Sequence, residues 1–239
     1  MRVMNSVAVA LLLGLNAPFV ASSTGFGGFA AAAQRQDQRE QTESDKHINH
    51  VMYEGGDTPR GMGFLPIAIG EAQLAQLHAT LGLEERESLE AMKTHARHVL
   101  HTVDPSQVSE GPGMGYGVKR ATEQLVMHVE LAASAGDATD AAKMHVPHVA
   151  RAARNTTGWV GEIAALAERI EATTSTSQAA PLMEGLKTLA DQLLDGNDAN
   201  KDGTVGVQEG GLWMAEEHMA RLLRAQDLSS KESVEGNLR

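Results

Sequence analysis

The chain of 239 residues contains no cysteine. This absence excludes disulfide bonds, thiolate-held zinc, cysteine-held iron–sulfur clusters, haem attached through paired cysteines and a cysteine nucleophile. Any metal ion that the protein binds must therefore be held by oxygen atoms, imidazole rings or thioethers.

Aromatic residues make up only 3% of the chain, and basic residues are outnumbered by acidic ones, 20 to 31, which gives a formal net charge of −11. Long β-branched runs are also scarce, whereas Ala, Leu, Glu and Met are common, and this balance favours helices over strands. We therefore predict an all-α fold, a helical bundle. The lack of excess positive charge argues against a nucleic-acid partner, because phosphates would not be neutralised.

The one strongly apolar run lies at the amino terminus, where residues 7–15 read VAVALLLGL after the basic Arg2. A run of this length is too short to cross a bilayer, which needs about 20 residues. Small residues follow it, so residues 1–33 are predicted to be a signal peptide cleaved after Ser23 or after Ala33. We expect an exported bacterial protein, periplasmic or secreted, with no membrane span.

The remaining chain divides by composition. The polar residues 34–46 are predicted to be a disordered leader, and the glycine-rich stretch that follows, to Pro66, an ordered but irregular segment. We expect a histidine-rich helical bundle over 47–172, a helix–loop–helix module over 181–225 and a polar tail over 226–239. The expected helices span 70–81, 84–103, 118–134, 137–155, 158–172, 181–194 and 209–225, with a kink at Pro147.

Residues 198–209 read DANKDGTVGVQE, which matches the oxygen-donor pattern of a calcium-binding loop. Calcium takes six to eight oxygen ligands from a loop that turns sharply at a glycine, and Gly203 stands at that sixth position. The predicted ligands, at loop positions one, three, five, seven and twelve, are Asp198, Asn200, Asp202, Thr204 (through its carbonyl) and Glu209.

This segment is similar to an EF-hand, and the resemblance implies a Ca²⁺ site flanked by two helices. Two features differ from the family pattern. Residues 195–197 (DGN) should end the incoming helix a turn early, and Gly210–Gly211 should loosen the start of the outgoing helix. Because only one such loop is present, we expect weak and structural binding, with a Kd on the order of 10⁻⁴–10⁻³ M.

Ten histidines are present, and several recur three residues apart. On the helix predicted around residues 137–155, His145 and His148 share an alanine-rich face, and His128 lies on the apolar stripe of the helix before it. These three imidazoles are predicted to face the bundle interior. His95 borders the apolar face of another helix, with His98 further round.

The candidate transition-metal or haem site consists of five histidines: His95, His98, His128, His145 and His148. Imidazole is the commonest metal ligand, and methionine sulfur from Met92, Met127 or Met144 would suit copper or haem iron. His47 and His50 form a further pair before the first expected helix. The remaining histidines, His78, His101 and His218, are interpreted as ordinary core or surface residues.

Two interpretations of the bundle remain open at this level. In the first, it holds copper, zinc, nickel or iron beside the Ca²⁺ loop. In the second, it is an electron-transfer protein with copper or haem b, similar only in outline to the b-type cytochrome bundles. A plain interaction module is a third alternative. No hydrolase motif is present, and residues 111–117 (GPGMGYG) lack the strand and Gly-Lys-Ser/Thr of a phosphate loop, so no catalytic residue is assigned.

Overall fold

All regular structure in residues 41–236, the part of the chain that the computed structural model describes, is helical, which confirms the all-α fold. The predicted signal peptide and most of the predicted leader lie outside the described residues. Residues 41–236 belong to one compact unit, and residues 181–225 share a hydrophobic core with the bundle. The helices are α2 (Glu43–Met52), α3 (Phe64–Glu84), α4 (Leu89–Val103), α5 (Val118–Ser134), α6 (Asp140–Glu171), α7 (Thr176–Asp195) and α8 (Leu212–Gly236), with a 3-10 turn at Pro59–Gly61.

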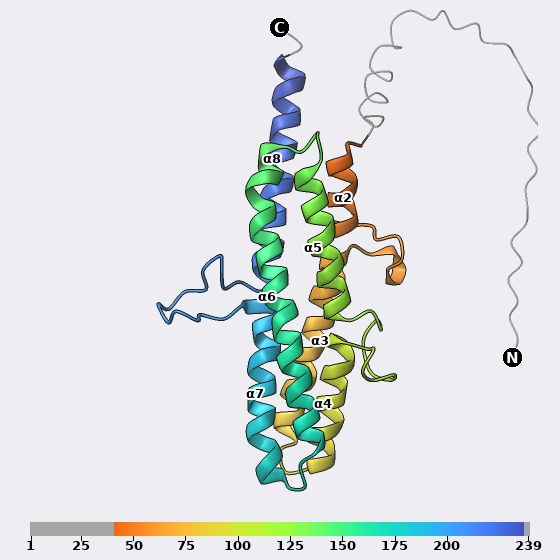
Figure 1. Ribbon diagram of the computed structural model, residues 1–239, viewed down its shortest axis with the longest axis vertical. Helices are drawn as coiled ribbons and strands as arrows, with labels where there is room; N and C mark the ends of the chain where they lie inside the picture. Colours follow the sequence, from red (N-terminus) through yellow and green to blue (C-terminus); the bar gives the residue numbers. More distant parts are fainter. Residues whose placement is uncertain (1–40, 237–239) are drawn as a thin grey trace, which may run out of the picture. The chain divides into compact units, whose positions relative to one another are not determined.

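The helices form four antiparallel columns (Figure 1). One column is the single 32-residue helix α6, which packs against α5 and α8 near its start and against α4 and α7 further along. Each of the other columns consists of two helices stacked end to end: α2 on α3, α4 below α5, and α7 below α8. The loops between the stacked helices project from the bundle at its middle.

A glycine stands at each of the three joints between stacked helices. A Cβ atom on Gly63 would lie 2.4 Å from the Met52 carbonyl carbon, and one on Gly117 would lie 3.1 Å from the Val103 oxygen. A Cβ atom on Gly211 would lie 2.7 Å from the Leu194 oxygen. In each case the contacted backbone belongs to the last turn of the preceding helix, so only glycine allows the next helix to begin there.

The sequence-based helix limits are right for α5 and wrong where tertiary contacts decide. Residues 137–172 were expected as two helices, yet α6 is continuous. Thr156, at the expected break, is buried, and its hydroxyl reaches the Leu193 oxygen of α7 at 3.4 Å. Pro147 lies within α6 on its exposed side. The predicted linker 173–180 shrinks to a short turn before α7, and α8 continues to Gly236, through much of the predicted tail.

The first described helix, α2, was not expected at all. It covers the end of the predicted leader and places His47 and His50 on a helix. Its amino terminus is capped by Thr42 and also by Asp137, whose carboxylate accepts hydrogen bonds from the Glu43 and Ser44 amides at 2.8 and 3.1 Å. The second cap lies more than 90 residues away along the chain, so sequence periodicity gives no sign of it.

The core is built largely from small side chains. Alanines recur along the buried faces of α3, α5 and α6, and larger residues such as Leu65, Ile163 and Leu186 fill the space between them. The small side chains allow the helices to approach one another closely. No helix within residues 41–236 has the length and apolarity needed to cross a membrane.

The amides of the glycine-rich loop 111–117 bind a carboxyl group of α3. Glu71 on α3 is fully buried, and its Oε1 accepts hydrogen bonds from the Met114, Tyr116 and Gly117 amides at 3.0–3.4 Å. Burial raises the pKa of this carboxyl group above its ordinary value, although the three amides act in the opposite direction. These hydrogen bonds hold the loop against the side of α3.

A matched pair of glycine substitutions tests the joints. Gly211→Ala should lower the free energy of unfolding by about 1–3 kcal/mol, because its Cβ atom would press on fixed backbone. Gly158 lies on an exposed face of α6 with open space around it. Gly158→Ala should therefore raise the free energy of unfolding by about 0.5–1 kcal/mol. Urea unfolding measures both. A Gly211→Ala protein as stable as the wild type would show that the joint is loose.

Candidate metal centres

Nine of the ten histidines, all of which lie in the described part of the chain, gather in three clusters built in the same way. Each cluster joins a pair spaced three residues apart on one helix to a single histidine on a neighbouring helix. The α2–α5 cluster is His47, His50 and His128; the α3–α4 cluster is His78, His95 and His98; the α6–α8 cluster is His145, His148 and His218.

In the α2–α5 cluster, the three rings converge on one point between two helices. The Nδ1 atoms of His47 and His50 lie 3.0 and 3.3 Å from the Nδ1 atom of His128. Two nitrogens bound to one tetrahedral Zn²⁺ at about 2.0–2.1 Å lie about 3.3–3.4 Å apart, so this spacing fits a shared ion. Phe64 covers the cluster, with its ring centroid 5.1 Å from that of His128.

In the α3–α4 cluster, His78 and His95 approach in the same manner, with their Nδ1 atoms 3.1 Å apart. The Nδ1 atom of His98 is buried and has no hydrogen-bond partner, which is costly for an imidazole nitrogen unless an ion binds it. On the outer side, the Nε2 atom of His95 lies 3.9 Å from the Glu85 carboxylate. This distance is longer than a hydrogen bond, so the carboxylate places negative charge near the ring without fixing its orientation.

In both of these clusters the three imidazoles can each offer one nitrogen, and the three nitrogens lie within 4.8 Å of one another. The six rings are half-buried at helix interfaces, near the surface and not at the centre of the bundle as was expected for His128. Burial lowers the pKa of His128 to about 4, and burial followed by neighbouring histidines lowers the pKa of His78. A lowered pKa favours the neutral imidazole in His128 and His78, which is the form that binds metal.

The structure corrects the grouping expected from the sequence. The five histidines proposed as one set are divided among three clusters: His128 in the first, His95 and His98 in the second, His145 and His148 in the third. His78 and His218, interpreted as ordinary residues, supply the single histidine of two clusters. His47 and His50, given lower weight, lie beside His128. The three-residue spacing of His47 and His50 is the sequence signal that could have identified that pair, whereas His78 and His218 have no such signal.

The tenth histidine, His101, belongs to none of the three clusters. His101 is buried, and its Nδ1 atom lies 2.9 Å from the Pro112 oxygen in the glycine-rich loop, so it anchors that loop. Met92 is fully buried in the hydrophobic core, whereas Met127 and Met144 are exposed.

The loop between α7 and α8 contains the five residues predicted to bind calcium. Helix α7 ends at Asp195, before the first predicted ligand, and α8 begins at Leu212, after the two glycines, as the departures from the EF-hand pattern suggested. The backbone turns at Lys201 and Gly203, which have φ angles of 60° and 88°.

Carboxylates draw the two ends of this loop together. Glu209 Oε1 accepts hydrogen bonds from the Ala199 and Asn200 amides at 3.1 and 3.0 Å, while Asp198 accepts from Asp202 and Gly203 at 3.1 and 2.9 Å. The loop is also tied to α6, where Asn155 donates to the Gln208 and Gly210 oxygens at 2.9 and 3.1 Å. The carboxylates at loop positions one and twelve, Asp198 and Glu209, thus both bind amides between residues 199 and 203.

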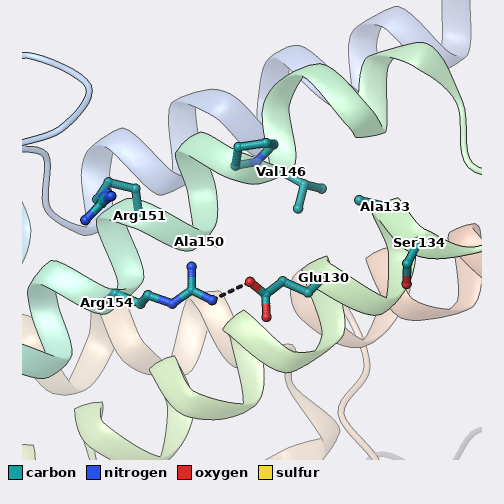
Figure 2. Close-up of a pocket in the computed structure, with 8 residues that line it drawn as sticks. Glu130, Ala133, Ser134, Val146, Ala150, Arg151 and Arg154 are labelled. Carbon is teal, nitrogen blue, oxygen red and sulfur yellow. Dashed lines mark hydrogen bonds and ion pairs between the residues drawn. The ribbon is translucent and has the colours of Figure 1, made fainter.

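A separate open hollow of about 550 Å³ lies between α5 and α6 (Figure 2). Its walls are small or apolar, from Ala133, Val146 and Ala150, and an ion pair between Arg154 and Glu130 crosses it. Arg151 also lines the hollow.

Comparison of the chain with protein-family models, with curated protein sequences and with solved structures gave no match. The chemistry of the histidine clusters and of the acidic loop is therefore the basis for inferring function.

The depressed pKa of His128 gives a pH dependence of stability that can be measured without metal. Because its folded-state pKa of about 4 lies below the unfolded value near 6.5, the unfolded state binds more protons between these values. The chelated protein should therefore lose stability as pH falls from about 6.5 towards 4. Chemical unfolding of His128→Gln in the same buffers should show a shallower slope, and an unchanged slope would contradict this assignment.

Proposed function

We propose that this protein is an exported metal-binding protein whose helical bundle holds divalent transition-metal ions at tri-histidine sites. The observation that carries the proposal is the convergence of three imidazole nitrogens within 4.8 Å in both the α2–α5 and the α3–α4 cluster. Imidazole nitrogens that face one another at 3.0–3.3 Å need either a shared proton or a shared ion.

The donor set favours particular ions. Three imidazoles without thiolate or carboxylate suit zinc, copper, nickel or iron, in preference to calcium or magnesium, which require oxygen. Three protein ligands leave a fourth position for water or for a ligand from a partner. The clusters lie near the surface, which gives ions a short path in and out. Binding and release of the ion, and not chemistry upon it, is the role that we assign.

We further propose that the acidic loop 198–209 binds Ca²⁺. Its support is the combination of oxygen donors at EF-hand spacing with a backbone that brings Glu209 back over the start of the loop. Oxygen donors in the loop and nitrogen donors in the bundle divide the metals by type, so the two kinds of site would not compete. Calcium would act structurally, by fixing the connection between α7 and α8.

The second candidate function is electron transfer by copper in the same clusters. The support for it is the all-imidazole donor set, which binds copper tightly. Haem b is less compatible, because axial ligands of a haem lie on opposite faces of the macrocycle, whereas the nitrogens here face one another directly. Reversible reduction of a copper-loaded sample, followed by its electron paramagnetic resonance signal, separates this function from simple metal binding.

Single substitutions should remove the two sites independently. His128→Gln should abolish tight Zn²⁺ binding in the α2–α5 cluster and His78→Gln in the α3–α4 cluster, each lowering the Zn²⁺ content after equilibrium dialysis by one ion per chain. His101→Gln is the matched control, since that ring contacts the Pro112 oxygen and lies in neither cluster. Loss of zinc in the control, or none in the other two, would refute the assignment.

Glu209→Gln should weaken Ca²⁺ binding at least tenfold from a Kd on the order of 10⁻⁴–10⁻³ M, because it removes the bidentate carboxylate of the loop. Glu216→Gln makes the same charge change on an exposed position of α8 and should leave calcium binding unchanged. Calorimetry with Ca²⁺ on the chelator-treated proteins measures both. Equal calcium affinity of Glu209→Gln and the wild type would rule out the loop as the site.

A further inference from the structure

The α6–α8 cluster repeats the construction of the other two clusters on the opposite side of the bundle, where the carboxyl-terminal helix packs against α6. The Nδ1 atoms of His145 and His218 lie 3.1 Å apart. The ring of His148 approaches that of His218, with centroids 4.5 Å apart and an angle of 38° between the planes. His218 thus contacts both members of the pair on α6.

The surroundings of this cluster leave its nitrogens available to an ion. His218 is only 5% exposed, and the rings of His145 and His148 are half-buried beside it. The charged groups close to it on α8 are Arg221 and Glu217, which form an ion pair with each other. Burying imidazoles is costly unless their nitrogens are paired or bind an ion.

We propose that His145, His148 and His218 form a third transition-metal site, which takes the same imidazole-preferring divalent ions and cross-links α8 to α6. This inference rests on the proposed function, since it extends the same chemistry to a cluster between a different pair of helices. The ion binds His145 and His218 at their present spacing, and His148 completes the site by rotation of its side chain. Because that rotation costs free energy, the third site is weaker than the other two.

The position of the site gives it a mechanical consequence. Helix α8 follows directly after the 198–209 loop, and the Asn155 side chain of α6 already holds the end of that loop. His218 lies on the second turn of α8, so an ion there fixes the helix to α6 at a second point beyond its start. We therefore expect metal to protect the amide hydrogens of α8 from exchange.

The decisive experiment uses the full chain with the other two clusters disabled by His78→Gln and His128→Gln. In calcium-free buffer, this double variant should still bind one Zn²⁺ ion per chain, and zinc should slow amide exchange in α8. Adding His218→Gln should lower the zinc affinity at least tenfold and remove the protection. Circular dichroism checks that each variant is folded, and His148→Gln, a less buried position, provides a second test.

The outcomes separate the two proposals. Two zinc ions on the wild type and none on the double variant would overturn the third site and leave the proposed function standing. Zinc on the double variant that survives His218→Gln and His148→Gln would also overturn it, because the ion would then lie elsewhere. No zinc on the wild type would refute both. His101→Gln in the double-variant background should retain the ion and serves as the matched control.

Discussion

The end-to-end stacking of helices at glycine joints is the constraint on which the rest of this structure depends. At Gly63, Gly117 and Gly211 the next helix begins directly against the last turn of the one before. The α2–α3 and α4–α5 columns therefore match the length of the continuous helix α6, and the longer α7–α8 column extends beyond it. With the columns aligned in this way, histidines on different helices come to the same level. The clusters are thus a product of register, since a shift of one helical turn would separate each pair from its single partner by about 5.4 Å.

The sequence predicts the fold class and much of the helix content, and it fails where contacts between distant residues decide. Helix 118–134 follows from its apolar stripe and from the glycines before it. The continuity of α6 does not, because the residues of Asn155–Gly158 have low helix propensity and predict a break. In the structure the buried Thr156 bonds within α6 and to the Leu193 oxygen of α7. Likewise, α2 depends on the remote cap from Asp137.

The histidine pairs themselves are visible in the sequence, because a spacing of three residues places two rings on one helical face. Their partners are not. His78 and His218 stand alone on their helices, and nothing in a periodic pattern reveals which helices are neighbours or at which level they meet. This is why one set of five was expected where three clusters exist. The acidic loop differs, since all of its donors lie within twelve consecutive residues and local spacing is enough to identify them.

Under the proposed function, the metal sites would take the place of the disulfide cross-links that a chain without cysteine cannot form. Without disulfides, and with a core rich in alanine, the bundle gains less from each buried side chain than a leucine-rich core would. An ion bound only by the folded state at 100 times its Kd adds about 2.7 kcal/mol to stability. Each histidine cluster joins two helices, and the acidic loop joins α7 to α8. Metal ions would therefore supply the cross-links that an exported protein usually obtains from cysteine, with the difference that these cross-links respond to the metal concentration around the protein.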